Sequence, residues 1–511
     1  MAAWLLPDVA ASLRGLYGAQ VAGTLNLPAQ WWLWGVMVSV LGALLAGLGS
    51  ILRAARLPLL ALAQPQAWRL AQGPWLSRQA WVAGLLLVLA SACGVFGDSL
   101  PGAFGMLAAL LLGAALALPA WLDRVLAWLA RRCQRPLAQW FVADSRQQLS
   151  ALSLALMALL LALAASVGVG SMTEGFRKTF VGWLDQRLSA DLYVSPSDTA
   201  QGLQIAQWLG QQPAVRVVLP GWRVETQVQG WPVQVQGIVD HPVYHSRWPL
   251  LEQQPQAWQL LAEGQAVMLS EQLARRLRLH LGDHLKLPTD PSRGLLVVGL
   301  YADYGNPKGQ MLVNAQSLRA HWPDAALTGL SVDLLDPQGA ALKAALQQRF
   351  HLDDSRVVQQ AQLKRWSTEV FNRTFAATAA LNSLTLGVAG VALFINLLTL
   401  GQSRLRQLAP LWALGVRRTQ LVWLSLGQAL LLSSLTVLLA LPLGLLLAWC
   451  LVAVVNVQAF GWRLPLHVFP AQLLQLALLG LLTSLLASAW PLWQLARRQP
   501  RELLRPFADE T

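Results

Sequence analysis

The chain consists of long apolar runs separated by short polar segments, and one polar stretch of domain size interrupts the series. A helix needs about 20 apolar residues to cross the hydrocarbon core of a bilayer. Runs near that length lie at residues 31–52, 80–96, 102–122, 150–171, 376–400, 421–452 and 473–493. The pattern therefore predicts a polytopic α-helical membrane protein with about seven transmembrane helices.

The residues between the fourth and fifth runs have the pattern of a soluble domain that mixes helices and strands. Period-two alternation predicts strands at residues 190–194, 215–218, 223–237, 295–300 and 310–313. Between the strands, Ser270 followed by Glu271 predicts the start of a helix that ends at Leu277. We therefore expect one α+β domain outside the membrane.

Two amphipathic segments join this domain to the neighbouring spans. Each has an apolar helical face: Phe176, Phe180 and Trp183 before the domain, and Trp366, Val370, Phe371 and Phe375 after it. The pattern predicts a paired stalk that projects from the bilayer. Two independent surface helices are the alternative interpretation.

The distribution of charge predicts the orientation of the spans. Lys and Arg total 38 against 25 Asp and Glu, and many of the arginines stand next to apolar runs, in residues 53–78, 124–135, 404–418 and 497–505. Cytoplasmic loops carry an excess of basic residues, so these segments are expected in the cytoplasm and the α+β domain on the other side. In a bacterium with two membranes, the chain is a multi-pass protein of the cell inner membrane with its large domain in the periplasm. No nucleic-acid-binding motif accompanies the charge.

The interiors of the predicted spans contain no Asp, Glu, Lys, Arg or His. Ionisable groups in mid-membrane mark the proton and ion pathways of secondary transporters, so this class of protein is disfavoured. The three cysteines, Cys93, Cys133 and Cys450, all lie outside the α+β domain, which must therefore fold without a disulfide.

Candidate catalytic and metal-binding residues are sparse. His241 and His245 have i, i+4 spacing next to Asp240, but Pro242 argues against a helix there, so a polar loop is expected rather than a metal site. No Gly-rich loop ends in Lys-Ser or Lys-Thr, and no nucleophile-elbow sequence is present. We expect no enzyme activity, metal or cofactor in this chain.

A basic segment, residues 402–420, separates the fifth and sixth spans. Its basic and apolar positions predict a short helix that lies along the cytoplasmic membrane surface and stops near a glycine. The residues that carry this interpretation are Arg404, Arg406, Leu408, Leu411, Trp412, Leu414, Gly415, Arg417 and Arg418. Pro410 would kink the helix or mark a late start, and a basic loop is the alternative.

The order of these elements resembles the FtsX/MacB class of ATP-binding-cassette (ABC) transporter permeases. Residues 404–421 (RLRQLAPLWALGVRRTQL) resemble the short cytoplasmic coupling helix of that class. Residues 190–194 (ADLYV) and 267–287 resemble two segments of its MacB-like periplasmic core domain, and residues 496–504 (ARRQPRELL) resemble its closing segment. Gln407 and Gln428 stand where many members of the class carry glutamate.

The resemblance covers residues 150–505 and implies a division of the chain. It gives a transmembrane helix at 150–172, a periplasmic α+β domain with stalk helices at 173–373 and an FtsX-like permease domain at 374–511. Residues 65–149 correspond to the two linking helices of ten-helix members. Pro-Ala-Gln at 28–30 recurs at 470–472, and this internal repeat makes residues 1–64 the terminal helix of a first module that is otherwise mostly lacking.

The resemblance also implies a function. A permease of this class binds a cytoplasmic ABC ATPase subunit through its coupling helix, and ATP-driven motion reaches the periplasmic domain through the stalk. Lipids, lipoproteins, peptides and hydrophobic compounds are all candidate substrates, and membrane lipid and a periplasmic protein or lipoprotein are candidate partners. The alternative is an FtsX-like signal transmitter that transports nothing and activates a periplasmic partner.

Overall fold

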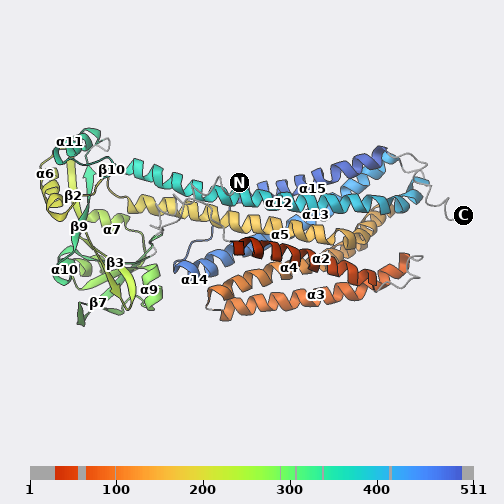
Figure 1. Cartoon of the computed structure of the whole chain (residues 1–511), viewed down its shortest axis with the longest axis horizontal. Coiled ribbons are helices and arrows are strands. Elements are labelled where there is room, and N and C mark those ends of the chain that lie inside the picture. Colours follow the sequence, from red (N-terminus) through yellow and green to blue (C-terminus); the bar gives the residue numbers. More distant parts are fainter. Residues whose placement is uncertain are drawn as a thin grey trace.

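The molecule is elongated, with a bundle of long helices at one end and a sheet domain at the other (Figure 1). The computed structural model describes residues 29–55, 65–97, 99–287, 289–304, 306, 308–335, 339–413 and 417–497. The long helices are α2 (Ala29–Ala55), α3 (Pro65–Phe96), α4 (Leu100–Arg132), α5 (Pro136–Arg187), α12 (Gln360–Ala413), α13 (Arg418–Cys450) and α15 (Pro470–Arg497).

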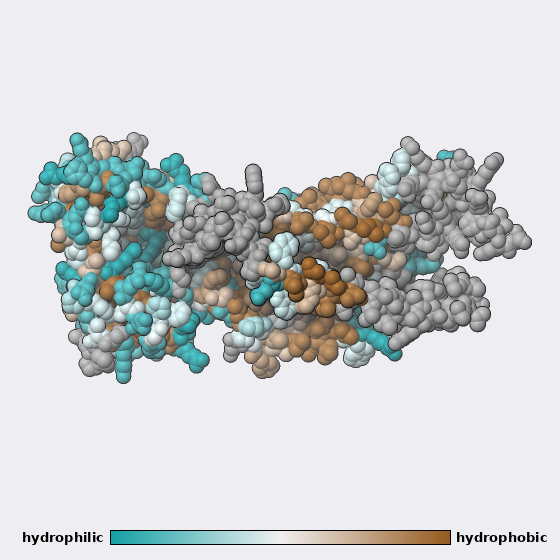
Figure 2. Space-filling view, viewed as in Figure 1, coloured by the Kyte–Doolittle hydropathy of each residue, from teal (hydrophilic) through white to brown (hydrophobic). Residues whose placement is uncertain are grey.

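Six stretches of these helices are long and apolar enough to cross a membrane. They are Ser77–Phe96, Leu100–Arg132, Ala151–Arg187, Thr378–Leu398, Thr419–Phe460 and Pro470–Trp493. They match the second to seventh predicted runs, and α2 covers the first run. Figure 2 shows the hydrophobic surface on the bundle, whereas the sheet domain is mostly hydrophilic. The prediction of a polytopic membrane protein with one α+β domain is confirmed.

Helix α5 forms the centre of the bundle and packs against α4, α12 and α13. Its side chains Leu156, Leu159 and Leu160 are at most 1% exposed. At the contact with α13, a Cβ atom added to Gly444 would lie 2.5 Å from the Cβ of Val167. The backbones of α5 and α13 can approach this closely because the interface has no side chain at Gly444.

Helix α13 continues beyond its last residue. One π-helical turn (Leu451–Val455) leads into α14 (Asn456–Phe460), and the helix ends at Gly461, whose φ of +78° suits glycine. The side chain of Asn456 donates a hydrogen bond to the carbonyl oxygen of Trp462 over 2.7 Å. This bond turns the chain back into a loop, residues 461–469, that precedes α15.

The sheet domain is built on one mixed sheet. Its described strands are β1 (Leu192–Val194), β2 (Val215–Val228), β3 (Trp231–Ile238), β4 (Leu250–Gln253), β5 (Ala266–Ser270), β6 (His284–Leu287), β7 (Asp290–Tyr301), β8 (Gly309–Asn314), β9 (Ala326–Leu334) and β10 (Val357–Gln359). The order is β10-β1-β9-β2-β3-β8-β5-β7-β4, and β6 also pairs with β7. The pairs β3–β8 and β5–β7 are parallel and the others are antiparallel.

Short helices cover the sheet and close two hydrophobic cores. Side chains from α6 (Thr199–Leu209), α9 (Glu271–Leu277), α10 (Ala315–His321) and α11 (Ala340–Phe350) join the larger core. Side chains from α7 (Pro242–Arg247) and α8 (Ala257–Ala262) join the smaller one. The domain therefore holds together by apolar burial, as expected for a domain whose sequence has no cysteine.

The structure refines two predictions in this domain. The single strand predicted at 223–237 is a hairpin, because Gln229 and Gly230 turn the chain with φ values of +51° and +78°. Ser270 directly precedes α9 as predicted, but its hydroxyl does not cap that helix. It accepts a hydrogen bond from the backbone N–H of Gln310, 3.1 Å away on β8.

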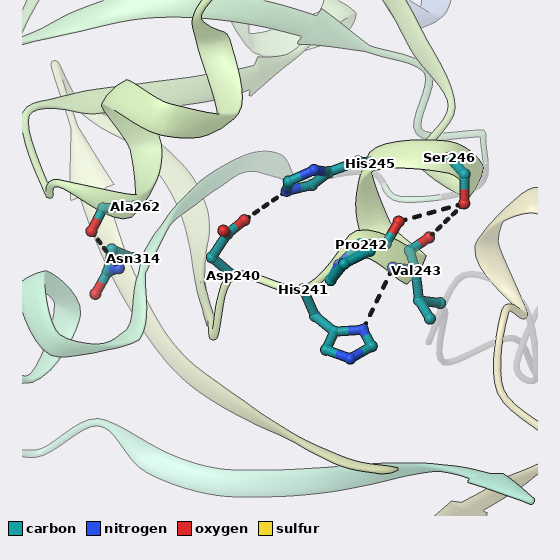
Figure 3. Close-up of polar contacts among 8 residues, drawn as sticks. All are labelled: Asp240, His241, Pro242, Val243, His245, Ser246, Ala262 and Asn314. Carbon is teal, nitrogen blue, oxygen red and sulfur yellow. Dashed lines mark hydrogen bonds and ion pairs between the residues drawn. The ribbon is translucent and has the colours of Figure 1, made fainter. Parts of the chain in front are cut away.

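The prediction that Pro242 prevents a helix is wrong. Helix α7 begins at Pro242, because the first position of a helix needs no N–H donor and the fixed φ of proline suits it. His241 precedes the helix and accepts a hydrogen bond from the N–H of Val243, whereas Nε2 of His245 lies 2.6 Å from Oδ1 of Asp240 (Figure 3). The two imidazole rings thus bind different partners. In the part of the chain that the structure describes, no group of three or more His, Cys, Asp or Glu residues could hold a metal ion.

Candidate functional site

The sheet domain is attached to the bundle by two continuous helices. Strand β1 follows α5 after four residues, and α12 begins directly after β10. The two helices pack side by side (Figure 1), and Lys364 on α12 forms an ion pair with Asp185 on α5. Gln360 closes the base of the domain, because its backbone N–H donates to the carbonyl oxygen of Asp191 over 2.9 Å. Any displacement of α5 relative to α12 must therefore reach β1 and β10.

Aromatic side chains fill the space where these helices meet the domain. We call this cluster the aromatic junction; it consists of Phe176, Phe180 and Trp183 on α5, Tyr304 after β7, Phe375 on α12 and Trp462 in the loop before α15. The ring centroids of Phe176 and Trp462 are 5.5 Å apart and those of Tyr304 and Trp462 are 5.2 Å apart. Each such pair contributes about 0.5–1.5 kcal/mol beyond the burial of its area.

A hydrogen bond fixes the orientation of Trp183 in the aromatic junction. The indole N–H of Trp183 donates a hydrogen bond to the carbonyl oxygen of Ala302 over 2.9 Å. Burial raises the pKa of Tyr304 to about 12, so this side chain stays neutral across the physiological pH range. The junction is thus an uncharged contact that joins α5 to the segment after β7.

The loop before α15 makes a third attachment. The backbone N–H of Arg463 donates to Oε2 of Glu271 over 3.1 Å, and Oε1 of Glu271 pairs with Arg275 at 2.8 Å. A Cβ atom added to Gly461 would lie 3.0 Å from Cγ of Gln272, so the loop rests closely on α9. The sequence did not predict this contact, because Glu271 and Arg463 are far apart in the chain and neither belongs to a recognisable motif.

The predicted stalk residues have different positions. Phe176, Phe180 and Trp183 belong to the aromatic junction, whereas Trp366 is 48% exposed and lies outside it. Val370 and Phe371 belong to α12, but their side chains lie outside the described part of the chain. Among the side chains of α12 that the structure describes, Phe375 belongs to the junction and Leu363 packs beside it.

The segment predicted to couple to an ATPase lies at the opposite end of the bundle, where α12 ends and α13 begins (Figure 1). The backbone from Arg404 to Ala413 continues α12 and forms no separate helix. Arg404, Arg406, Leu408, Leu411 and Trp412 are part of this extension, and Leu414 and Gly415 lie outside the described residues. Arg417 is exposed and precedes α13, whose first residue is Arg418.

A buried polar cluster ties α5 to α13 near this end. Gln428 is 1% exposed, and its side-chain amide donates to Oδ2 of Asp144 over 2.8 Å. Gln148 donates to Oε1 of Gln428 over 2.9 Å and also to Asp144. Because a buried polar network is costly to break, α5 and α13 are expected to move together at this end of the bundle.

Two family models match the chain. Residues 152–349 match the MacB-like periplasmic core domain, and residues 379–500 match the FtsX-like permease C-terminal domain. The first match covers most of α5 and the sheet domain up to α11, and the second covers most of α12, all of α13 and α14, and α15.

One curated relative and two solved structures are also similar to parts of this chain. An uncharacterized ABC transporter permease protein of Mycobacterium tuberculosis is 30% identical over 460 residues, which are 84% of this chain and 52% of that protein. The chain thus spans about half the length of this curated relative. The periplasmic region of MacB from Actinobacillus actinomycetemcomitans aligns at 12% identity over 35% of this chain and 91% of its own length, with a TM-score of 0.26. The extracellular domain of a noncanonic ABC-type transporter from Gram-positive bacteria aligns at 14% identity over 33% of this chain and 98% of its own length, with a TM-score of 0.25.

Proposed function

Because the chain belongs to the FtsX/MacB class of ABC transporter permeases, we propose that it transmits ATP-driven motion from the cytoplasm to its periplasmic sheet domain. The ATP is hydrolysed by a separate cytoplasmic ABC ATPase subunit that binds at the end of α12 and the start of α13. The observation that supports this most is the triple attachment of the sheet domain, through α5, α12 and the loop before α15. A domain held at three points follows the helices instead of moving freely on a linker.

We propose a division of the chain into segments that fits this mechanism. Residues 150–172 form a transmembrane helix, residues 173–373 the periplasmic domain with its stalk, and residues 374–511 the permease domain with the coupling segment. Residues 65–149 form two linking helices, and residues 1–64 contain α2, a counterpart of α15 in the internal repeat. The membrane is the cell inner membrane, and lipids, lipoproteins, peptides and hydrophobic compounds are the candidate substrates.

Charge reversal in the coupling segment tests the ATPase contact. We expect replacement of Arg404, Arg406, Arg417 and Arg418 by Glu to abolish co-purification with the ATPase subunit and the stimulation of its ATPase rate. The matched control reverses Arg124, Arg131, Arg132 and Arg135, four charges at the end of α4 and the start of α5, and should leave both unchanged. An intact complex with an unchanged ATPase rate in the first variant would show that this segment does not bind the ATPase.

Truncation of the aromatic junction tests transmission separately. Trp462→Ala leaves the ATPase contact intact but removes the ring that packs on Phe176 and Tyr304. We expect the complex to form and hydrolyse ATP, while periplasmic substrates no longer change its rate. Trp366→Ala removes an exposed indole and is the matched control. Equal behaviour of the two variants would contradict transmission through the junction.

A second candidate function is a signal transmitter that moves no substrate. The close packing of α5 on α13 at Gly444 and Gly168 favours it, since no polar path separates these helices at the contact. ATPase stimulation by a lipid or peptide would support export. Stimulation that requires a periplasmic protein, such as one that acts on the cell wall, would support signalling.

A further inference from the structure

Two arginines meet on the sheet face that receives the end of α5. Arg187, the last residue of α5, donates hydrogen bonds to Oε1 of Gln236 at 2.9 Å and to Oε1 of Gln310 at 3.1 Å. Its guanidinium carbon lies 4.2 Å from the ring centroid of Trp248. All of these partners are neutral, so they orient the charge of Arg187 without balancing it.

Arg223 is the second arginine. Arg223 lies on β2 directly across from Gln236 on β3. The side chains of such a pair lie on the same face of the sheet, so Arg223 is next to the amide that Arg187 binds. Its side chain is accessible to solvent, yet desolvation by the surrounding protein lowers its pKa. Repulsion from Arg187 lowers the pKa further, and attraction to the carboxyl group of Asp303 raises it in part.

The nearby carboxylates do not pair with these two arginines. No ion pair joins either guanidinium to a carboxylate in the described part of the chain. Glu225 is bound to Lys308 at 2.7 Å. Burial raises the pKa of Asp303, while attraction to Arg187 and Arg223 lowers it in part, so this carboxyl group lies within electrostatic range of both arginines. Its Oδ2 accepts a hydrogen bond from the side-chain amide of Asn306. Two guanidinium groups thus face one carboxyl group, which leaves an excess of positive charge on this sheet face.

The neutral groups around Arg187 form a connected network. Gln310 is 4% exposed, its Oε1 also accepts from the hydroxyl of Tyr301 at 3.1 Å, and its amide donates to Gln234 at 3.0 Å. Burial raises the pKa of Tyr301 well above its usual value, so its hydroxyl remains a donor. The network holds Arg187 in one orientation before any ligand arrives, which lowers the entropic cost of binding.

We propose that Arg187 and Arg223 form a binding site for a phosphate or carboxylate group. The guanidinium fork matches the geometry of both oxyanions and binds them with two parallel hydrogen bonds. A ligand of this kind adds negative charge to that of Asp303, a single carboxyl group within electrostatic range of both arginines. The site does not depend on the proposed ATPase contact.

The position of the site restricts the source of the anion. The apolar run of α5 ends near residue 171, so Arg187 lies 16 residues further along the helix, about 24 Å at 1.5 Å per residue. Headgroup regions extend only about 5–8 Å beyond the hydrocarbon core. A lipid in the bilayer cannot reach this site, so the anion belongs to a soluble molecule or to an amphiphile that has left the bilayer.

Binding to the full chain tests the proposal. The chain is placed in nanodiscs of phosphatidylcholine without an ATPase and titrated by calorimetry with glycerol 3-phosphate and with dihexanoylphosphatidylglycerol below its micelle concentration. We expect saturable binding that Arg223→Gln weakens by roughly tenfold or more, since a charge-assisted bond is lost. Arg216→Gln makes the same charge change on the same strand, away from the site, and should bind as the wild type does.

A second variant separates binding from folding. Gln236→Glu keeps both arginines and places a carboxylate across from Arg223, so it should abolish binding while the thermal unfolding midpoint is retained. Saturation by glycerol 3-phosphate identifies a soluble anion, and saturation by the lipid alone identifies an extracted amphiphile; both support the site. Absence of saturable binding by either probe to the folded chain, or equal affinity in Arg223→Gln, overturns it.

Discussion

At the scale of single residues, Gln428 shows how one uncharged side chain holds two helices together. Its amide binds Asp144 on α5 as a donor and Gln148 as an acceptor, inside the contact between α5 and α13. A glutamate at the same position has no N–H to donate to a carboxylate. The identity of this residue therefore determines whether the two helices attract or repel each other at this point.

We predict that Gln428→Glu destabilises the bundle by about 1–3 kcal/mol, because a buried donor is replaced by a charge next to Asp144. The thermal unfolding midpoint in detergent at neutral pH is the measurement. Gln420→Glu makes the same change at an exposed position in the first turn of α13 and should have little effect. An unchanged midpoint in Gln428→Glu would contradict the role given to the cluster.

Sequence patterns located only part of the candidate site. Phe176, Phe180 and Trp183 were predicted from their common helical face, since local periodicity shows which side of a helix is apolar. Trp366 also fits an apolar face but is exposed, because α12 turns other residues toward α5. The bond between Arg463 and Glu271 depends on tertiary structure alone, which no local pattern encodes.

At the scale of elements, the contact between α5 and α13 depends on small residues. A Cβ atom at Gly444 would meet both the side chain of Val167 and the backbone oxygen of Ala164, at 2.5 and 3.0 Å. The backbone of α5 cannot shift at one residue without disturbing its helix, so a larger residue at position 444 must push the two helices apart.

We expect Gly444→Ala to lower the stability of the bundle by about 1–3 kcal/mol, measured as a lower thermal unfolding midpoint in detergent. Gly387→Ala on α12 is the matched control, since nothing lies within 4 Å of the added Cβ. That variant should be neutral or slightly stabilising, because alanine favours helix formation over glycine. Equal midpoints for the two variants would show that α5 and α13 can move apart at Gly444 without loss of stability.

Among the elements, the membrane spans were predicted best, because each is a long run of apolar residues. The spans were found because about 20 consecutive apolar residues have few other structures available. Helix α7 was missed because Pro242 was judged as a breaker instead of as a first residue. The separate helix expected from 404 onward continues α12 as far as Ala413, since amphipathicity alone does not mark where one helix ends.

At the scale of the whole molecule, two arginine-rich segments of the sequence lie at the same end of the helix bundle. The ends of α4 and α12 and the starts of α5 and α13 lie together, away from the sheet domain (Figure 1). These are the places where the sequence has its arginine-rich segments at 124–135 and 404–418. The arrangement suits an orientation in which this end of the bundle faces the cytoplasm.

We predict that a cysteine at Glu252→Cys, on exposed β4, reacts with a membrane-impermeant maleimide in spheroplasts. Arg417→Cys, before α13, should react only after the membrane is disrupted. The chain with its three native cysteines gives the background labelling. If only Arg417→Cys reacted in intact spheroplasts, the orientation would be the opposite one, with the sheet domain in the cytoplasm.

The unbroken length of α5 and α12 gives the molecule a lever arm. The helices have 52 and 54 residues, which correspond to about 78 and 81 Å at 1.5 Å per residue. A tilt of about 5° pivoted at one end would swing the other end by roughly 7 Å. That is more than the spacing between two neighbouring strands, about 4.8 Å. A small change of angle at the end proposed to bind the ATPase would thus displace the sheet domain by more than the distance between two of its strands.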